Sequence, residues 1–218
     1  MRYPCMVMIT KKKYMEKIKV LLLIDVQRDF IDMSLANKDA QACIPGIVNK
    51  IDNFNGDVIL LTMDTHGEDY LDTPEGKKLP IKHCIYNTLG WKIDDKIRTA
   101  LNRKIVNGTR VVFVPKNTFG SINPDKIIPP EDYFESSMLH SSLVECINAI
   151  HTIENKNIDV EICGFVTDIC VISNVLALKA SAYDYAEITL DSKCCAGLTP
   201  EKHKAALEVM ESCQINII

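Results

Sequence analysis

The sequence has few of the features that mark membrane, secreted or nucleic-acid-binding proteins. Its longest apolar runs fall far short of the roughly 20 residues that a membrane-spanning helix needs. No apolar stretch of signal-peptide length is followed by a small-residue cleavage site. The formal net charge is only −4, which gives no reason to expect binding to nucleic acid or to an anionic membrane. We therefore expect a globular protein without a nucleic-acid or membrane partner.

The cysteines also lack the usual patterns of metal-binding or disulfide-rich proteins. There are nine of them, an odd number, and no two are spaced as CxxC. The spacings are typical neither of a zinc ribbon nor of a disulfide framework. We expect reduced thiols in a cytoplasmic protein, most of them serving as small hydrophobic core residues.

The length and composition suit one globular α/β domain. The chain has 218 residues, of which 47% are hydrophobic, enough for a full core. "MEKIKVLLLIDVQ", which begins at Met15, could open a compact domain by itself. We therefore interpret residues 1–14 as a short N-terminal extension without an assigned function, and 15–218 as a single domain.

Runs of consecutive apolar and β-branched residues predict strands that are buried on both faces. The four longest runs cover 19–25, 57–64, 110–116 and 159–165, and two shorter ones cover 187–191 and 215–218. Helix-like stretches lie between them at 43–55, 94–103, 138–154, 168–182 and 200–213, the last with Thr199 as N-cap and Pro200 in its first turn. This alternation predicts a parallel sheet that is covered by helices on both faces.

Three reactive side chains follow different strands of this predicted sheet. Asp25 ends the first run, Lys116 ends the third, and Cys170 lies where a helix begins after the fourth. Each has a plain alternative: a turn residue, a solvated lysine and a buried inert thiol. Open parallel sheets, however, bind ligands at the carboxyl ends of their strands. The coincidence on one edge favours a functional site.

The combination also makes chemical sense. The thiolate is the reactive form of cysteine, and a helix N-terminus and a nearby cation both favour it. Asp25 could carry the proton between the Cys170 thiol and a leaving group. We interpret Asp168, two residues before Cys170, as a structural residue that caps the helix or binds the backbone of the turn.

Three stretches carry a resemblance to a known family. "LLLIDVQRDF", "PKNTFGS" and "GFVTDICV" resemble, in order and spacing, the signatures of the isochorismatase-like cysteine hydrolases, over about residues 18–218. The resemblance implies a three-layer α/β/α fold with a six-stranded, mostly parallel sheet, and catalysis by Asp25, Lys116 and Cys170. It also implies a cis peptide bond before Val166, with the N–H groups of Val166 and Cys170 forming an oxyanion hole.

The end of the second apolar run and the long irregular stretch that follows it, residues 65–93, offer candidate metal ligands. They are Asp64 at the end of the run and His66, Glu75 and His83 in the stretch. In the D-x-H pair the two side chains lie on the same side of an extended segment, and the whole set suits Zn²⁺, Mn²⁺ or Fe²⁺. Exposed histidines and acids in a loop are the ordinary alternative.

The same loop resembles the nicotinamidase/pyrazinamidase branch of the family, in which a D-x-H pair is followed by a later "HC" pair. The resemblance implies one divalent metal ion, most simply zinc, that binds the pyridine nitrogen of the substrate. One departure is Pro80, which stands where many members of this branch carry a tryptophan, three residues before the later histidine. Phe30, Phe119 and Val166 are our candidates for packing on the substrate ring, although both phenylalanines could equally be core residues.

We therefore expect a cytoplasmic nicotinamidase that converts nicotinamide to nicotinate and ammonia through a thioester on Cys170, and that also cleaves pyrazinamide. The resemblance suggests a homo-oligomer. Two alternatives stay open. One is a hydrolase of the same family that acts on a different small amide, with a vestigial metal site. The other is a non-enzymatic metal or redox sensor that uses several of the nine thiols.

Overall fold

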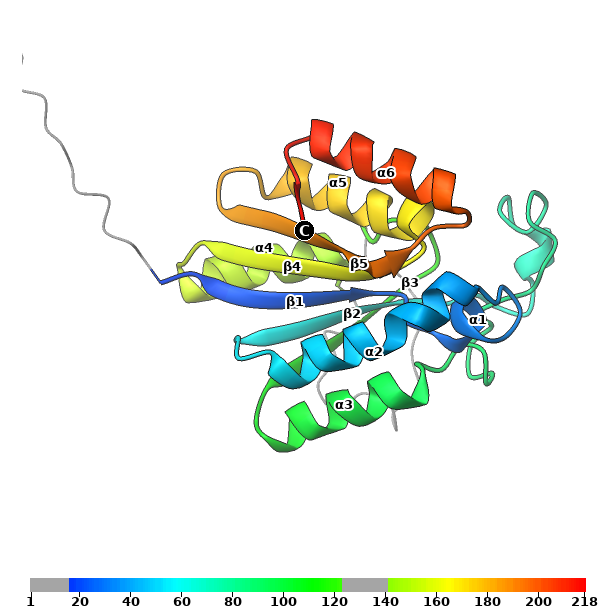
Figure 1. The fold of residues 1–218 in the computed structure, drawn as a ribbon, viewed down its shortest axis with the longest axis horizontal. Coiled ribbons are helices and arrows are strands. Elements are labelled where there is room, and N and C mark those ends of the chain that lie inside the picture. Colours follow the sequence, from blue (N-terminus) through cyan, green and yellow to red (C-terminus); the bar gives the residue numbers. More distant parts are fainter. Residues whose placement is uncertain (1–15, 123–140) are drawn as a thin grey trace, which may run out of the picture.

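The computed structural model describes residues 16–122 and 141–218 (Figure 1). Within this part of the chain, six strands form one sheet in the order β3-β2-β1-β4-β5-β6, and neighbouring strands are parallel. The strands are β1 (Ile18–Ile24), β2 (Val58–Asp64), β3 (Arg110–Lys116), β4 (Ile158–Phe165), β5 (Ala186–Ala196) and β6 (Asn216–Ile217). The predicted six-stranded sheet is confirmed.

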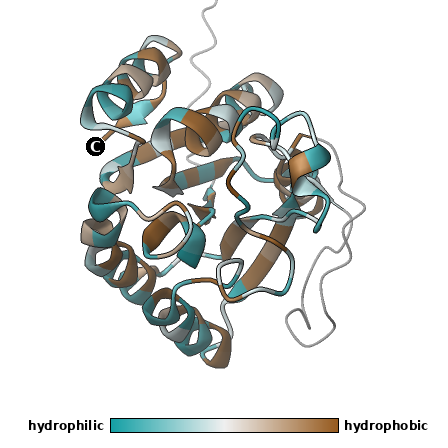
Figure 2. Ribbon diagram, turned by 90° about the vertical axis from the view of Figure 1, so that its right-hand side faces the viewer, coloured by the Kyte–Doolittle hydropathy of each residue, from teal (hydrophilic) through white to brown (hydrophobic). Residues whose placement is uncertain are grey.

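Helices cover both faces of the sheet, so the predicted three-layer α/β/α fold is confirmed as well (Figure 1). On one face lie α2 (Lys38–Asn53) and α3 (Asp95–Val106); on the other lie α4 (Leu143–Glu154), α5 (Ile172–Ser181) and α6 (Pro200–Ser212). A short helix, α1 (Arg28–Ile31), follows β1. Figure 2 shows the hydrophobic strands enclosed by helices whose outer sides are more hydrophilic.

The strand order reverses between β1 and β4. From β1 the chain proceeds outwards through β2 to β3, then crosses to the other side of β1 to form β4, β5 and β6. A crevice forms at such a reversal because the flanking loops turn in opposite directions. Asp25 follows β1 and Val166 follows β4. The switch point therefore lies where the sequence predicts the site.

Most predicted elements are found, with differences at their ends. Helix α2 begins at Lys38 rather than at residue 43, because the side chain of Asn37 accepts hydrogen bonds from the first backbone N–H groups and Pro45 is accommodated inside the helix. Strand β5 extends to Ala196, well beyond the predicted 187–191. Thr199 caps α6 as predicted. The predicted extension 1–14 and the first residues of the predicted helix 138–154 lie outside the described residues.

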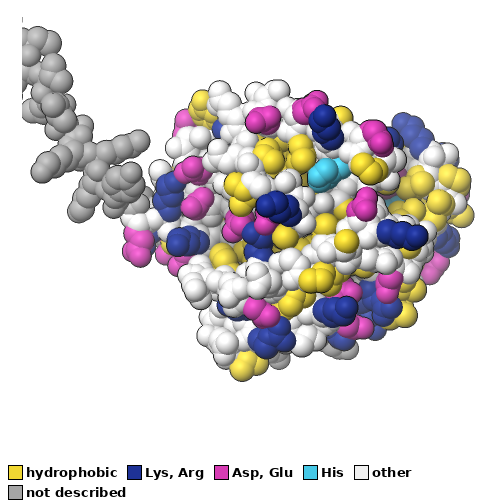
Figure 3. All heavy atoms as spheres, in the orientation of Figure 1, with side chains coloured by type: hydrophobic (Ala, Val, Ile, Leu, Met, Phe, Trp, Pro, Cys, Tyr) yellow, Lys and Arg dark blue, Asp and Glu magenta, His cyan; other side chains and the backbone are white. Residues whose placement is uncertain are grey.

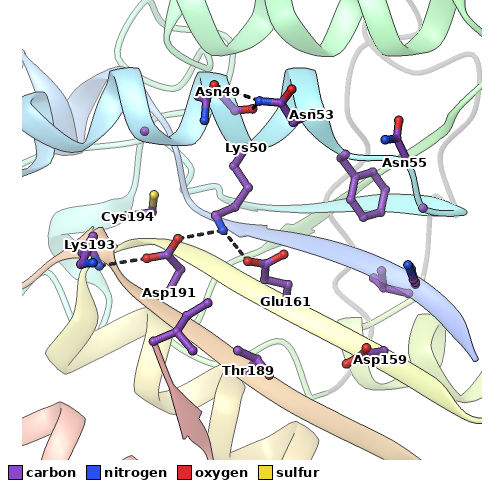
Figure 4. A pocket seen from close by; sticks show the side chains of 16 residues that line it. Asn49, Lys50, Asn53, Asn55, Asp159, Glu161, Thr189, Asp191, Lys193 and Cys194 are labelled. Carbon is purple, nitrogen blue, oxygen red and sulfur yellow. Dashed lines mark hydrogen bonds and ion pairs between the residues drawn. The ribbon is translucent and has the colours of Figure 1, made fainter.

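The surface shows no concentration of one charge on the face drawn in Figure 3, where basic and acidic side chains are interspersed. No helix in the described ranges has the length and apolar character to cross a membrane. A groove of about 820 Å³ lies near the amino ends of β1 and β4, where Lys50 forms ion pairs with Glu161 and Asp191 (Figure 4). It contains none of the predicted site residues.

Candidate active site

The structure brings Asp25, Lys116 and Cys170 together at the carboxyl ends of β1, β3 and β4. The Lys116 Nζ atom lies 2.7 Å from Asp25 Oδ2 and donates a hydrogen bond to Cys170 Sγ at 3.5 Å. All three residues are buried. An acid, an amine and a thiol from three separate strand ends thus form one contact group, as the sequence predicts.

Asp25 is held by the neighbouring strand β2. Its backbone turns out of β1 with a positive φ of 47°, and the hydroxyl of Thr62 donates a hydrogen bond to Asp25 Oδ1 at 2.6 Å. The other oxygen, Oδ2, is buried and makes the ion pair with Lys116. Burial raises the pKa of Asp25, and the positive charge of Lys116 offsets this only in part. Asp25 is therefore a carboxylate with an enhanced affinity for a proton.

Cys170 lies in a π-helical turn, Thr167–Val171, that leads into α5. The N–H groups on either side of it, those of Ile169 and Val171, donate hydrogen bonds to the Val166 carbonyl. The peptide bond between Phe165 and Val166 is cis, as the resemblance implies.

The expectation that the thiolate of Cys170 is favoured is wrong for this geometry. Burial raises the pKa of the thiol well above its usual value; Lys116 opposes this, but the nearby negative charges of Asp25 and Asp64 add to it. Burial and the two carboxylates therefore favour the thiol over the thiolate, although Lys116 opposes them. A base is then needed when the sulfur attacks a substrate, and Asp25 is in place for that role.

Three of the four predicted metal ligands form a buried group. Ligand atoms of Asp64, His66 and His83 all lie within 4.8 Å of one another. The Nε2 atoms of His66 and His83 lie 3.0 Å and 3.5 Å from Asp64 Oδ2. Glu75 lies just outside the group, with Oε1 3.7 Å from His83 Nε2.

These residues fit a divalent transition metal. The Nδ1 atom of His83 lies 2.9 Å from the carbonyl of Ile81, which favours a proton on Nδ1 and leaves Nε2 free to bind a metal ion. Burial raises the pKa of Asp64, but Lys116 and both histidines outweigh this effect, so that its pKa is lowered. An ionised carboxylate and two imidazoles are a common donor set for zinc and its neighbours in the periodic table.

Asp64 also links the two histidines to the group formed by Asp25, Lys116 and Cys170. Its second oxygen, Oδ1, lies 3.4 Å from Lys116 Nζ. The two predicted sites are therefore one continuous cluster, with Asp64 in contact with both halves.

The C-terminal part of the chain matches a known protein family. Residues 133–218 match the family model of the isochorismatase domain. No curated protein matches the sequence.

Solved structures similar to this isochorismatase-like fold include several nicotinamidases and pyrazinamidases. A nicotinamidase/pyrazinamidase from Bacillus subtilis has a TM-score of 0.69 at 21% identity, covering 92% of this chain and 98% of that one. A pyrazinamidase/nicotinamidase from Streptococcus mutans has 0.67 at 25%, covering 92% and 99%. A pyrazinamidase from Pyrococcus horikoshii, in complex with zinc, has 0.62 at 26%, covering 92% and 98%.

The isochorismatase-like fold also places the aromatic candidates. Phe30 is buried, with its ring 5.7 Å from that of His83, whereas 47% of Phe119 is exposed. Tyr70, which the sequence analysis did not single out, packs 4.7 Å from His66 and 4.9 Å from His83 between ring centroids. It lies in the long loop without any motif of its own, so only the folded structure reveals it.

Asp168 has a structural role, but not at its own helix. Its Oδ1 atom accepts a hydrogen bond from the Leu198 N–H at 2.8 Å, and the turn that begins after Val166 has no side-chain cap. The predicted capping is therefore wrong, while a backbone contact is present, made to the turn before α6. Asp168 connects the segment of Cys170 to the β5–α6 connection of this isochorismatase-like fold.

Proposed function

We propose that this protein is a nicotinamidase, which hydrolyses nicotinamide to nicotinate and ammonia and also cleaves pyrazinamide. The observation that carries the proposal is the position of Lys116, in contact with both the carboxylate of Asp25 and the thiol of Cys170. The adjacent Asp64, His66 and His83 group and the similarity to solved nicotinamidases support the choice of substrate.

In the first half of the reaction, Cys170 Sγ forms a bond to the carboxamide carbon while its proton passes to Asp25. The raised pKa of Asp25 suits a group that must accept this proton. The backbone N–H groups of Val166 and Cys170 are our candidates to stabilise the oxyanion. Asp25 then protonates the departing nitrogen, the C–N bond breaks, and ammonia leaves a thioester on Cys170.

In the second half, a water molecule attacks the thioester carbon and gives a proton to Asp25. The C–S bond breaks, nicotinate is released, and the proton returns to the sulfur of Cys170. Lys116 stays protonated throughout, because the charges of Asp25 and Asp64 raise its pKa despite its burial. It balances the negative charge that moves between the acid and the sulfur.

The candidate metal ligands and the aromatic residues beside them would orient the substrate. When bound, a divalent ion held by Asp64, His66 and His83, with Glu75 beside them as our fourth candidate ligand, would supply a Lewis acid for the pyridine nitrogen. Phe30, Phe119 and Val166 are our candidates for contacts with the ring. Phe30 is the best supported of these because its ring adjoins His83.

The test is ammonia release from nicotinamide, pyrazinamide and benzamide by purified protein, with metal content determined on the same sample. We expect turnover of the first two, a loss after chelation, and recovery with Zn²⁺, Mn²⁺ or Fe²⁺. Benzamide lacks the ring nitrogen and should react far more slowly. Equal rates on benzamide and nicotinamide would contradict the proposed role of the metal group, and no turnover in metal-loaded protein would exclude nicotinamide as the substrate.

The same experiment addresses the alternatives. A different amidase of the family would release ammonia from another small carboxamide only. A thiol-based sensor would require several accessible cysteines, yet seven of the eight cysteines in the described ranges are buried. We expect nicotinamide to protect a single thiol, Cys170, from slow alkylation, whereas a sensor would show several reactive thiols and no protection.

A further inference from the structure

Gln27 lies two residues after Asp25 and is fully buried, yet it has no part in the reaction steps above. Its side-chain amide forms three hydrogen bonds. Nε2 donates to the carbonyls of Asp64 and Trp91, both at 2.8 Å, and Oε1 accepts from the Asp64 N–H at 2.7 Å. The partners define the orientation of the amide, since a flipped amide would set its oxygen against two carbonyls.

The bonds to Asp64 take the place of backbone pairing with β1, which ends before it reaches Asp64. The last β1–β2 pair is Ile24 with Thr62, because β1 ends where Asp25 turns away with a positive φ. On its other side β2 stays paired with β3 up to Asp64, opposite Lys116. Asp64 would therefore have a strand neighbour on one side only. The amide of Gln27 fills the missing side and binds both backbone polar groups of Asp64, as a peptide group of β1 would.

The backbone of Gln27 is itself fixed. It forms an isolated antiparallel bridge with Ile93, and the Arg28 N–H donates to the Lys92 carbonyl at 2.9 Å. The indole N–H of Trp91 donates to the Thr65 hydroxyl at 2.9 Å. Gln27 and Trp91 thus hold consecutive residues, 64 and 65, from one side.

We propose that Gln27 is a positioning residue, which sets the orientation of Asp64. Asp64 thereby stays in contact with the two histidines on one side and with Lys116 on the other. The two carboxylate oxygens of Asp64 face different partners: Oδ2 faces His66 and His83, and Oδ1 faces Lys116. A rotation or shift of the Asp64 backbone would lengthen at least one of these sets of contacts. The effect on turnover rests on the proposed function, whereas the effect on metal binding does not.

The sharpest variant is Gln27→Glu, which keeps the shape of the side chain. It removes the two Nε2 donors and sets an oxygen against the carbonyls of Asp64 and Trp91. Gln41→Glu is the matched control, because Gln41 is exposed and its Nε2 atom donates to a single carbonyl, that of Ile31, at 2.8 Å. Folding of each variant is checked by circular dichroism and urea unfolding.

The primary measurement is Zn²⁺ affinity, by competition with a chromophoric chelator. Loss of groups that orient metal ligands typically weakens binding about 10- to 100-fold, so we expect at least a tenfold loss in Gln27→Glu and no change in Gln41→Glu. A residue that only stabilises the fold would lower the urea midpoint and leave the affinity of the folded protein unchanged. If Gln27→Glu does not fold, Gln27→Met, which loses all three hydrogen bonds of the amide without adding charge, is measured instead.

The outcomes separate the two proposals. A zinc affinity within about twofold of wild type in a folded Gln27 variant overturns the positioning role, whatever the enzyme does with nicotinamide. A wild-type protein that binds no Zn²⁺ also overturns it, because Asp64 would then not be a metal ligand. Weakened zinc binding in a protein that never hydrolyses nicotinamide supports the positioning role and removes only the proposed substrate.

Discussion

Replacing Lys116 by methionine should destabilise the metal-free protein strongly. The ammonium lies 2.7 Å from Asp25 Oδ2 and 3.4 Å from Asp64 Oδ1, and all three residues are buried. At an effective dielectric constant of about 20, the closer pair attracts with roughly 6 kcal/mol before desolvation is counted. Breaking a buried pair by removing one partner costs about 3–5 kcal/mol net, because the remaining charge is left uncompensated.

The measurement is urea unfolding near neutral pH in the presence of a chelator, so that no metal ion takes over the role of the lysine. Lys116→Met should lose about 3–5 kcal/mol of unfolding free energy, and adding Asp25→Asn should restore part of it by removing one of the buried charges. Lys82→Met is the control, since Lys82 pairs with Glu68 at the surface and should change stability by no more than about 1 kcal/mol. A Lys116→Met protein as stable as this control would refute the buried charge arrangement.

Three further predictions address the metal group, the sheet and the groove. His83→Ala should weaken Zn²⁺ binding at least about tenfold and raise KM with little change in folding; one tightly bound zinc ion with a normal KM would count against the assigned ligand. Gly164→Ala should lower the free energy of unfolding in urea by about 3 kcal/mol or more, because φ is +129° and a Cβ atom would lie 2.1 Å from the Ile24 carbonyl oxygen. Gly108→Ala is the control and should cost less, since its φ is +86° but the space around it is open. Equal costs would show that the clash at Gly164 is relieved. Asp191 lies in the groove of Figure 4, where burial raises its pKa, but its ion pair with Lys50 outweighs this and lowers the pKa below 3.8. The Asp191 carboxylate therefore stabilises the fold above that pH, and this contribution is lost as the pH falls. Asp191→Asn should thus lose less stability than wild type between about pH 7 and pH 3, and identical losses would disprove this link between protonation and stability.

The sequence predicts those parts of the molecule that follow from local pattern. Strand β3 is found at the predicted residues, 110–116, because a run buried on both faces must be apolar throughout. Asp25, Lys116 and Cys170 could be placed on one edge because the carboxyl ends of parallel strands meet there. Their contact depends in addition on packing, because β3 and β4 are not neighbours in the sheet and the Lys116 side chain spans the distance.

The rest depends on contacts between distant segments. Tyr70 and Gln27 join the site through a loop conformation and a side-chain hydrogen-bond pattern that no local periodicity encodes. The protonated state of Cys170 results from burial beside two carboxylates, whereas sequence reasoning weighed only the lysine and the helix. The early start of α2 depends on the Asn37 cap, which the apolar pattern of residues 43–55 does not indicate.

The central claim is that Cys170 is the nucleophile of an amide hydrolase. The most direct test compares ammonia release from nicotinamide by the wild-type protein and by Cys170→Ala, both loaded with zinc and shown to be folded. We predict turnover by the wild type and less than about a hundredth of that rate in the variant, a difference of more than roughly 2.7 kcal/mol in activation free energy. A folded Cys170→Ala protein that keeps more than this fraction of the rate would contradict the account.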